Sequence, residues 1–348
     1  MKLAFLSLSG LPPIASAAPS DVAADQPEPE RRQFEQVEMG MPFTVLLYSA
    51  DQEAANRAAA AAFARIGELN RVMSDYDPDS ELSRLSATAG RGKAVKVSDD
   101  LWIVLSRAQK LAAESDGAFD VTVGPYVKLW RRARRAKEMP SPERLAEAKA
   151  SVGHRFLRLD PQARSAELLK PGMRLDLGGI AVGYAIDEAL KVLAKHGITR
   201  ALIDGSGDIV VGDPPPGKAG WRVGVSPSEG KGSPPTRYLL LRNCSVTISG
   251  DDVQFVELEG KRYSHIVDSR TGLGLTDHSA VTIVAADGIT ADSLATAVSV
   301  LGPKRGLALV ETYRGASALI LQRQGDQVET SQSPGFGRYV IDEKPAKP

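Results

Sequence analysis

The order of apolar and polar positions predicts a mixture of strands and helices along most of the chain. The stretch PFTVLLYS (42–49) alternates as a half-buried strand does, and Asp51 is placed to cap the alanine-rich helix that follows at 52–74. A second helix follows Ser98, which is placed to cap it, because apolar residues recur along one face between 101 and 112.

Short apolar runs separated by turn-forming residues fill the second half of the chain. Strands are predicted at 200–213 (two strands joined by a glycine turn), 221–226, 237–242, 245–249, 254–258, 262–268, 279–286 and 317–321. Helices are predicted at 143–151, 180–190, 290–302 and 303–313. Because the strands come in runs with helices between only some of them, the sequence predicts an α+β fold, a single mixed α/β domain, rather than a doubly wound sheet.

The two ends of the chain differ in composition from this domain, which is predicted to extend over residues 34–335. Residues 1–17 place Lys2 before an apolar stretch and then small residues, an order typical of a cleaved secretory signal peptide. This interpretation predicts export, to the periplasm; the alternative is a disordered, mildly apolar tail. Residues 18–33 are rich in Pro, Ala and acidic residues and are predicted to be a disordered linker, and residues 336–348 a flexible tail. No later stretch is long and apolar enough to span a bilayer.

Composition excludes several kinds of partner and site. The chain of 348 residues carries 43 basic and 43 acidic side chains, so its formal net charge of zero gives no overall attraction to nucleic acid, and small-molecule or protein partners are expected. Five basic residues from Arg131 to Lys137 are predicted to lie on a solvated helix surface or loop rather than in a nucleic-acid site. Cys244 is the single cysteine, which excludes an intramolecular disulfide and a zinc site built from cysteines.

The segment RLDLGGIAVGYAIDEAL (174–190) places an acid and two glycines directly before a helix. Gly178 and Gly179 permit a tight turn, and the N-terminus of the helix offers free N–H groups and partial positive charge that attract phosphate. Asp176 has two interpretations. It complements the helix dipole, or it belongs to a site where a metal ion is bound together with a phosphorylated ligand.

A second acidic helix start lies near the end of the predicted domain. In ITADSLATAVSVLG, Asp292 and Thr296 are four residues apart in a helix that Thr290 is placed to cap, so a carboxylate and a hydroxyl lie on one face. An all-oxygen site of this kind suits a hard cation, and a partly hydrated Mg²⁺ that bridges substrate phosphates fits best. The alternative is an acid that complements the dipole of its own helix.

Three further stretches contain residues that suit catalysis or binding. His265 and Asp268 follow a predicted strand, where a histidine is suited to act as a general base, although a hydrogen-bonded structural pair explains the spacing equally. Phe119 and Asp120 follow a helix end, where an aromatic ring and an acid can stack on and hydrogen-bond a ligand ring, and where Phe119 also suits the core. The stretch GSGDIVVG does not satisfy the dinucleotide-binding fingerprint and is interpreted as a hairpin turn.

Six motifs in one order resemble a known family, the ApbE-like flavin transferases, which are FAD:protein FMN transferases. They are MGMPFTV, MSDYDPDSELSRLS, GAFDVTVGPYVKLW, DLGGIAVGYAIDEAL, SGDDVQFVELEGKRYSHIVDSRTG, and SVLG after TADSLAT. The resemblance extends from about Met39 to Glu311, which is nearly all of the chain beyond the linker.

The resemblance implies a fold, a reaction and its small molecules. Family members resemble one another in a single ApbE-like α+β domain, related to the T-fold, that holds the substrate FAD in a central cleft. They use Mg²⁺, with Mn²⁺ as an alternative, to transfer the FMN half of FAD to a threonine of a partner protein, and they release AMP. The acceptor protein would carry a D-G-x-T-type threonine motif.

The resemblance also assigns roles to residues of this chain by their motifs. The residues implied to bind FAD are Met39, Tyr76, Ala118, Phe119 and Asp120 in the flavin and adenine pockets, Asp176 at the nucleotide, and Ile266 through its backbone. The implied metal ligands are the Gly179 carbonyl, Asp292 and Thr296. His265 would be the residue nearest the chemistry, where it could take the proton of the incoming threonine.

Three positions depart from the family pattern. Val182 stands where members commonly carry Lys, which removes a positive charge expected near the phosphates. Ser269 stands in place of the proline of D-P-x-T-G and is expected to loosen that turn. Ala295 stands where some relatives carry an acid, so the ion is expected to keep one more water here.

Two other functions share the same pocket residues. One is an FAD pyrophosphatase, in which water replaces the threonine and FMN and AMP leave free. The other is a flavin-binding protein without turnover. The sequence favours the transferase and leaves both alternatives open.

Overall fold

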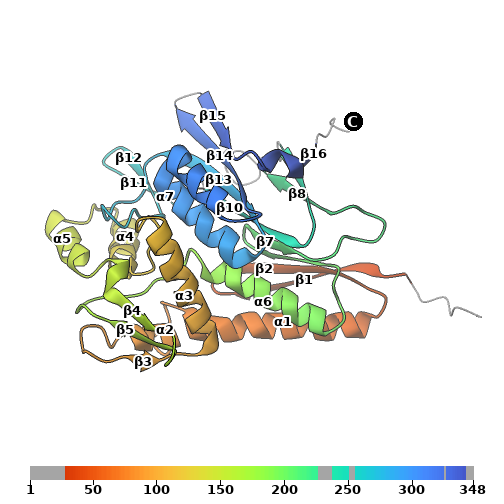
Figure 1. Ribbon diagram of the computed structural model, residues 1–348, viewed down its shortest axis with the longest axis horizontal. Helices are drawn as coiled ribbons and strands as arrows, with labels where there is room; N and C mark the ends of the chain where they lie inside the picture. Colours follow the sequence, from red (N-terminus) through yellow and green to blue (C-terminus); the bar gives the residue numbers. More distant parts are fainter. Residues whose placement is uncertain (1–27, 226–236, 251–254, 325–326, 342–348) are drawn as a thin grey trace, which may run out of the picture.

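A large antiparallel sheet forms the centre of the computed structural model, which describes residues 28–225, 237–250, 255–324 and 327–341 (Figure 1). Every pair of neighbouring strands in this sheet is antiparallel. In spatial order its strands are β1 (Glu30–Glu38), β2 (Met41–Ser49), β6 (Ala201–Gly205), β7 (Asp208–Val211), β10 (Cys244–Gly250), β13 (His278–Ala285), β14 (Ser317–Gln324) and β15 (Gln327–Gln332).

Three smaller sheets surround the large one. They are β3 (Val95–Lys96), β5 (Ser165–Leu168) and β4 (Leu157–Asp160); β16 (Val340–Ile341), β9 (Arg237–Leu241) and β8 (Trp221–Val225); and the hairpin β11 (Phe255–Leu258) and β12 (Lys261–Ser264). The α+β fold predicted from the runs of strands is therefore confirmed, and no parallel pairing links neighbouring strands of the described sheets.

Five of the seven described α-helices begin at a side-chain cap, and α4 and α6 do not. They are α1 (Gln52–Met73), α2 (Glu81–Ser86), α3 (Asp99–Glu114), α4 (Gly124–Ala136), α5 (Pro142–Ala150), α6 (Ala181–Lys195) and α7 (Gly288–Thr312), with 3₁₀ turns η1 (His154–Phe156) and η2 (Phe336–Tyr339). The Asp51 side chain accepts hydrogen bonds from the Glu53 and Ala54 N–H groups, and Ser98 accepts one from Leu101, as the sequence predicts.

The large sheet is covered on both faces. Helices α1, α6 and α7 pack against β2, β6, β7, β10 and β13 on one face (Figure 1). On the other face, β8 and β9 form a second apolar cluster with alternate residues of β7, β10, β13 and β14. Neighbouring residues such as Val210 and Val211 enter different clusters because successive side chains of a strand point to opposite faces.

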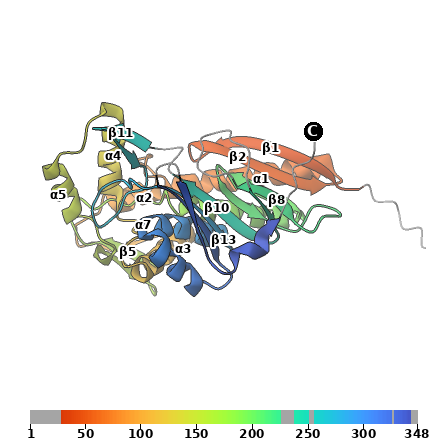
Figure 2. The same cartoon turned by 90° about the horizontal axis from the view of Figure 1, so that it is seen from above.

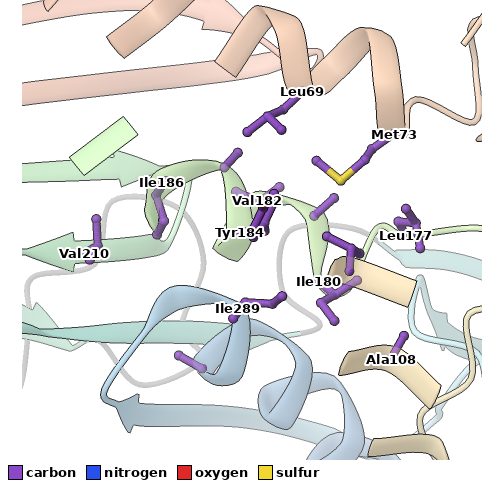
Figure 3. Packing of buried hydrophobic residues seen from close by; sticks show 14 of the residues in the cluster. Leu69, Met73, Ala108, Leu177, Ile180, Val182, Tyr184, Ile186, Val210 and Ile289 are labelled. Atoms are coloured by element: carbon purple, nitrogen blue, oxygen red, sulfur yellow. The ribbon is translucent and has the colours of Figure 1, made fainter. Parts of the chain in front are cut away.

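The main core lies where α6 passes between α1 and α7. Figure 3 shows Leu69 and Met73 of α1 on one side of the first turns of α6 and Ile289 of α7 on the other. Between them lie Ile180 and Val182, both buried. This packing holds the start of α6 directly beside the start of α7.

A smaller lobe lies at one end of the molecule. Helices α4 and α5 and the hairpin β11–β12 lie together there in both views (Figures 1 and 2). Tyr126 and Trp130 of α4 pack with Val256 and Leu258 of β11 in a separate apolar cluster. The Trp130 indole N–H donates to the Gly272 carbonyl at 2.8 Å, which ties α4 to the turn that follows β12.

Helix α7 differs from the sequence prediction in its cap and in its length. Thr290 is not its cap: α7 begins two residues earlier, and the Asp287 side chain caps it by accepting from the Thr290 N–H at 3.0 Å. The helices predicted at 290–302 and 303–313 are contiguous, with a kink at Gly302, whose φ of +73° is not helical, followed by Pro303. Proline cannot continue the hydrogen bonds of the preceding turn, which is why the sequence pattern broke there.

The predicted ends of the domain also need correction. Residues 30–33 are not linker: β1 begins at Glu30 and pairs with β2 in register from Glu30 with Ser49 to Glu38 with Met41. Residues 336–341 are not a loose tail either, because Phe336 is fully buried in the second cluster and β16 pairs with β9. Both segments are stabilised by contacts with distant residues, which composition does not reveal. Residues 1–27, with the predicted signal peptide, and 342–348 lie outside the described residues.

Several elements were shorter than predicted or were missed. The predicted strand 262–268 ends at Ser264, so His265 to Asp268 form a loop. Helix α4, which contains the basic run except Lys137, and the small sheet β3–β5–β4 were not predicted as such. None of the helices in the described ranges combines the length and the apolar character that crossing a membrane requires.

Candidate active site

The turn before α6 is tightly organised. The Asp176 N–H donates to the Val121 carbonyl at 2.8 Å, and its side-chain Oδ1 accepts from the Gly178 N–H at 2.9 Å. Asp176 therefore stabilises the diglycine turn through one carboxylate oxygen, Oδ1. Burial raises the pKa of the Asp176 carboxyl, and nearby Asp75 raises it further, against the lowering by the Gly178 N–H and by Arg131 and Arg174.

The diglycine turn meets α7 at the two residues predicted to bind metal. A Cβ added to Gly179 would lie 2.6 Å from Thr296 Oγ1, so only a glycine permits this approach. One turn further on, the Gly183 N–H donates to Asp292 Oδ2 at 3.0 Å. The structure thus brings together Gly179, Asp292 and Thr296, which are far apart in the sequence.

Oxygen atoms in this corner lack partners. Among the described residues no N–H or O–H group donates to Asp292 Oδ1 or to the Gly179 carbonyl, because Gly183 donates to Asp292 instead of to the carbonyl four residues earlier. The Thr296 hydroxyl likewise makes no hydrogen bond there, whereas the hydroxyl groups of Ser293 and Ser299 on the same helix donate to the carbonyls of Ile289 and Ala295. A carboxylate, a hydroxyl and a carbonyl that converge without donors fit a hard divalent cation.

The electrostatic surroundings also favour a cation. Burial raises the pKa of Asp292 well above its usual range, and the carboxyls of Asp208 and Asp187 raise it further. Burial also raises the pKa of Asp208 to about 6, with a contribution from Asp204, although Thr247 donates to Asp208 at 2.6 Å. Within the described residues no three His, Cys, Asp or Glu side chains form a metal-binding group, so a cation here would keep oxygens from solvent or substrate.

Three of the predicted site residues, Ala118, His265 and Ile266, lie at the loop that follows β12. Ala118 and Ile266 pack together with Val300 of α7 in a small apolar cluster. His265 is exposed immediately before Ile266, at the edge of this cluster. The structure thereby unites the segments around 118, 266 and 300. A cavity of about 140 Å³ adjoins them, lined in part by Leu275, Val300 and Leu301.

Phe119 and Asp120 have internal partners. Phe119 is buried in the main core. Asp120 accepts from the Thr122 N–H and hydroxyl and, through Oδ2, from the His154 N–H at 2.7 Å. Burial raises the pKa of Asp120, against these hydrogen bonds. The two side chains therefore hold the loop that carries Ala118.

Tyr76 and Asp176 are joined by a residue that the sequence analysis placed on a solvated surface. The Arg131 guanidinium lies 4.0 Å from the centre of the Tyr76 ring and donates to Asp176 Oδ2 at 3.1 Å. It also binds the Asp75 carboxylate through two nitrogens. The prediction of a solvated helix surface or loop for the basic run is thus wrong for Arg131, because its side chain is only about one-fifth exposed and pairs with carboxylates 45 and 56 residues away in the sequence. Arg131 lies seven residues after the first residue of α4, and no feature of the local sequence indicates that it contacts Tyr76 and Asp176.

Met39 packs against the main core and is not part of the small cluster of Ala118, Ile266 and Val300. It occupies the two-residue turn between β1 and β2 with a φ of +51° and packs partly buried against the main core. No hydrogen bond of the described residues joins its side chain to Tyr76, Asp176 or Ile266. Its role at the flavin remains a prediction.

The three departures from the family pattern have local explanations. Val182 is buried, and its Cγ1 lies 2.9 Å from the position of a Cβ on Gly205, so it packs α6 against the turn between β6 and β7. Ser269 does not loosen its turn, because its hydroxyl donates to the Gly117 carbonyl and the Gly272 N–H donates to Asp268 O at 2.8 Å. Ala295 is buried in the main core.

Comparison with solved structures defines the class of protein. The fold matches flavin transferases: ApbE from Vibrio cholerae, with a TM-score of 0.80 and 26% identity over 89% of this chain and 99% of that one, and ApbE from Pseudomonas stutzeri, with a TM-score of 0.78 and 29% identity over 90% and 97%. Among curated proteins, the FAD:protein FMN transferases of Treponema pallidum and Haemophilus influenzae are 35% and 33% identical over 74% and 76% of this chain and 75% and 79% of their own lengths.

The chain belongs to the ApbE family, whose profile matches residues 39–320. The predicted resemblance is thereby confirmed, and so is the prediction that the chain is an enzyme, because its relatives are named as transferases. The residue roles carried over from the motifs are not tested by these similarities.

Proposed function

We propose that this chain is a Mg²⁺-dependent FAD:protein FMN transferase that attaches FMN to a threonine of a partner protein and releases AMP. The observation that carries the proposal is the convergence of the Gly179 carbonyl, Asp292 and Thr296, whose free oxygens suit a hard cation beside a helix start that suits a diphosphate. The names of the relatives supply the substrates.

In the proposed reaction, the threonine oxygen forms a bond to the FMN phosphorus while the bond from that phosphorus to the bridging oxygen breaks. AMP leaves with the electron pair, and the proton of the threonine hydroxyl passes to a ring nitrogen of His265. A Mg²⁺ ion held by Gly179, Asp292 and Thr296 would act as a Lewis acid for the negative charge that develops on the bridging oxygen. The residues of the chain mainly position the reactants, as in other phosphoryl transfers.

Each part of the site has a task in this proposal. The diglycine turn lets the chain approach the diphosphate, and Asp176 receives hydrogen bonds from the nucleotide. Ile266 contacts FAD through its backbone, which the apolar contact with Ala118 and Val300 holds in place. The exposed position of His265 leaves it accessible to a partner protein.

Export to the periplasm completes the proposal. It rests on the composition of residues 1–17, and the acceptor would be a protein of the same compartment with a D-G-x-T-type motif. Detection of a mature chain that lacks these residues in a periplasmic fraction tests it.

The decisive experiment mixes the purified protein with FAD, Mg²⁺ and an acceptor protein that carries a D-G-x-T-type threonine. Covalent flavin fluorescence on the acceptor, abolished by a chelator, is expected. Free FMN and AMP without labelled acceptor would instead identify a pyrophosphatase, and unchanged FAD a binding protein.

Two substitutions test the metal ligands. Asp292→Asn and Thr296→Val are each expected to lower the transfer rate at least about a hundredfold at low Mg²⁺, because each removes an oxygen ligand. Ser299→Ala is the matched control, since that hydroxyl is bound within the helix, and it should keep the parent rate. Full transfer by Asp292→Asn at low Mg²⁺ would exclude the proposed ion site.

The role of His265 is tested separately. His265→Ala should lower the rate of transfer without weakening FAD binding. A parent rate of FMN transfer in this variant would exclude His265 as the proton acceptor.

A further inference from the structure

Arg131 reaches the nucleotide end of the site because α4 begins in close contact with the strand-like segment before the diglycine turn. Val123 forms a parallel bridge with Arg174, and Gly124 lies so near the Arg174 carbonyl that a Cβ would collide with it. Two turns further along α4, the Arg131 guanidinium therefore lies over Asp176. The close approach of Gly124 fixes the position of the arginine.

Arg131 contacts three side chains, those of Asp75, Tyr76 and Asp176, which come from two of the family motifs. It binds both oxygens of Asp75, it donates to Asp176 Oδ2 at 3.1 Å, and its guanidinium lies 4.0 Å from the centre of the Tyr76 ring. Both carboxylate side chains are about one-tenth exposed. A planar guanidinium can satisfy two carboxylates and an aromatic face at once, which an ammonium group cannot do.

The charge of Arg131 is already neutralised. Two carboxylates, Asp75 and Asp176, share it, and Arg174 lies 4.0 Å from Asp75 and also donates to the Asp75 carbonyl. Two positive and two negative groups leave no excess charge for the phosphates of a dinucleotide. Arg131 therefore does not replace the lysine that is absent at position 182; its contribution is to orient its partners.

Tyr76 is an unusual partner for an arginine that is largely buried. Its side chain is 76% exposed, the largest exposed fraction among the exposed large hydrophobic residues of the described chain. One face of the ring is covered by Arg131, and the ring as a whole is open to solvent. An aromatic ring held on one face and exposed otherwise is suited to stack on a planar ligand.

We propose that Arg131 is a positioning residue for the adenosine half of FAD, which fixes the Tyr76 ring for stacking on the base and the Asp176 carboxylate for hydrogen bonds to the nucleoside. The inference rests on the proposed function for the identity of the ligand. One arginine of the basic run would thus contribute to the selectivity for FAD over FMN. It would contact neither the metal ion nor the FMN half that is transferred.

The test compares the affinities of the enzyme for FAD and for FMN, which lacks the AMP half, that is, the adenosine and one phosphate. Both dissociation constants are measured by flavin fluorescence in the presence of a chelator. For Arg131→Ala, the dissociation constant of FAD is expected to rise about tenfold or more, since a cation–π contact and three charge-assisted hydrogen bonds are lost. The dissociation constant of FMN is expected to change less than about twofold.

Three further variants separate positioning from a general structural effect. Arg135→Ala removes an exposed arginine one turn along the same helix and should leave both constants unchanged. Arg131→Lys keeps the charge and should recover part of the affinity for FAD. Tyr76→Ala removes an exposed ring that the fold does not need, and in this background Arg131→Ala should have a smaller effect, because the two residues act together.

In steady state, Arg131→Ala should raise KM for FAD while kcat falls less than about threefold. The inference is overturned if the ratio of FAD to FMN affinity equals that of the parent, if the parent itself binds FMN as tightly as FAD, or if FAD and FMN binding fall together. Absence of FMN transfer by the parent enzyme, with the affinity ratio changed as expected, would contradict the proposed function and leave the role of Arg131 intact.

Discussion

At the scale of single residues, the candidate site consists of one buried carboxylate, Asp292, and two partly buried groups whose oxygens receive no donor from the described residues. Asp292 uses one oxygen to accept from the Gly183 N–H, and Thr296 keeps its hydroxyl free of the helix carbonyl that its serine neighbours use. Oxygens that receive no donor from the described residues are available to a ligand. Gly179 is the third member, because the absence of a side chain allows its carbonyl to approach.

Gly179→Ala tests that argument. The added Cβ would lie 2.6 Å from Thr296 Oγ1 and 3.3 Å from its Cβ and Cγ2, so the turn and α7 must separate. We expect FMN transfer to fall at least about tenfold and the free energy of unfolding to fall by about 1–3 kcal/mol. Transfer assays and urea unfolding measure the two effects.

Gly337→Ala is the control, since a Cβ there would meet nothing within 4 Å. A Gly179→Ala enzyme with parent activity would show that the close approach of this glycine to Thr296 is not needed for the reaction.

At the scale of elements, the site depends on the junction of α6 and α7. The Gly183 and Gly288 backbones are in direct contact, so neither position has room for a side chain. Asp187 of α6 accepts from the first N–H groups of α7, Gly288 at 2.7 Å and Ile289 at 3.0 Å. This carboxylate thus caps one helix from another and sets the orientation of the face that carries Asp292.

The same junction predicts a dependence of stability on pH. Burial raises the pKa of Asp187 to about 6, although the two N–H groups lower it. A raised folded-state pKa means that the folded protein holds the proton more firmly than the unfolded chain, so this contribution to stability is complete below about pH 4 and is lost as the pH rises through about 6.

Asp187→Asn keeps an acceptor oxygen and removes the titration. Its free energy of unfolding, compared with that of the parent, should therefore rise by about 2–3 kcal/mol between pH 4 and pH 7. Denaturant unfolding at several pH values measures this difference. As a control, Asp79→Asn, at an exposed position, should show the same dependence of the free energy of unfolding on pH as the parent. The prediction would be contradicted if Asp187→Asn also showed the pH dependence of the parent.

At the scale of the whole molecule, two apolar clusters on opposite faces of the sheet divide structural tasks. The cluster under α1, α6 and α7 supports the site, whereas the cluster under β8 and β9 includes Phe336 near the end of the described chain. The segment around Phe336 thus closes the second face, and its loss should affect stability far more than chemistry.

Phe336→Ala is expected to lower the free energy of unfolding by about 3–5 kcal/mol, because it opens a cavity in a fully buried position. The affinity for FAD at low temperature should remain that of the parent, since the site lies on the other face of the sheet. Urea unfolding and fluorescence titration measure the two quantities. Val328→Ala, at a position 44% exposed on β15, is the control, and a comparable loss of stability there would contradict this division.

The sequence by itself determined the features that depend on neighbouring residues. The caps Asp51 and Ser98, the diglycine turn before α6 and the four-residue spacing of Asp292 and Thr296 all follow from local periodicity and backbone preference. Collinear motifs then identified the family and hence the fold.

The tertiary structure alone decided which distant residues meet. It placed Arg131 between Tyr76 and Asp176 and Phe336 in the second cluster, whereas the approach of Thr296 to Gly179 was already implied by the family resemblance. A basic run at the surface of a helix and one with a buried arginine have the same local pattern, because burial and pairing arise when segments far apart in the chain pack together. That packing is a property of the whole fold, which no window of the sequence contains.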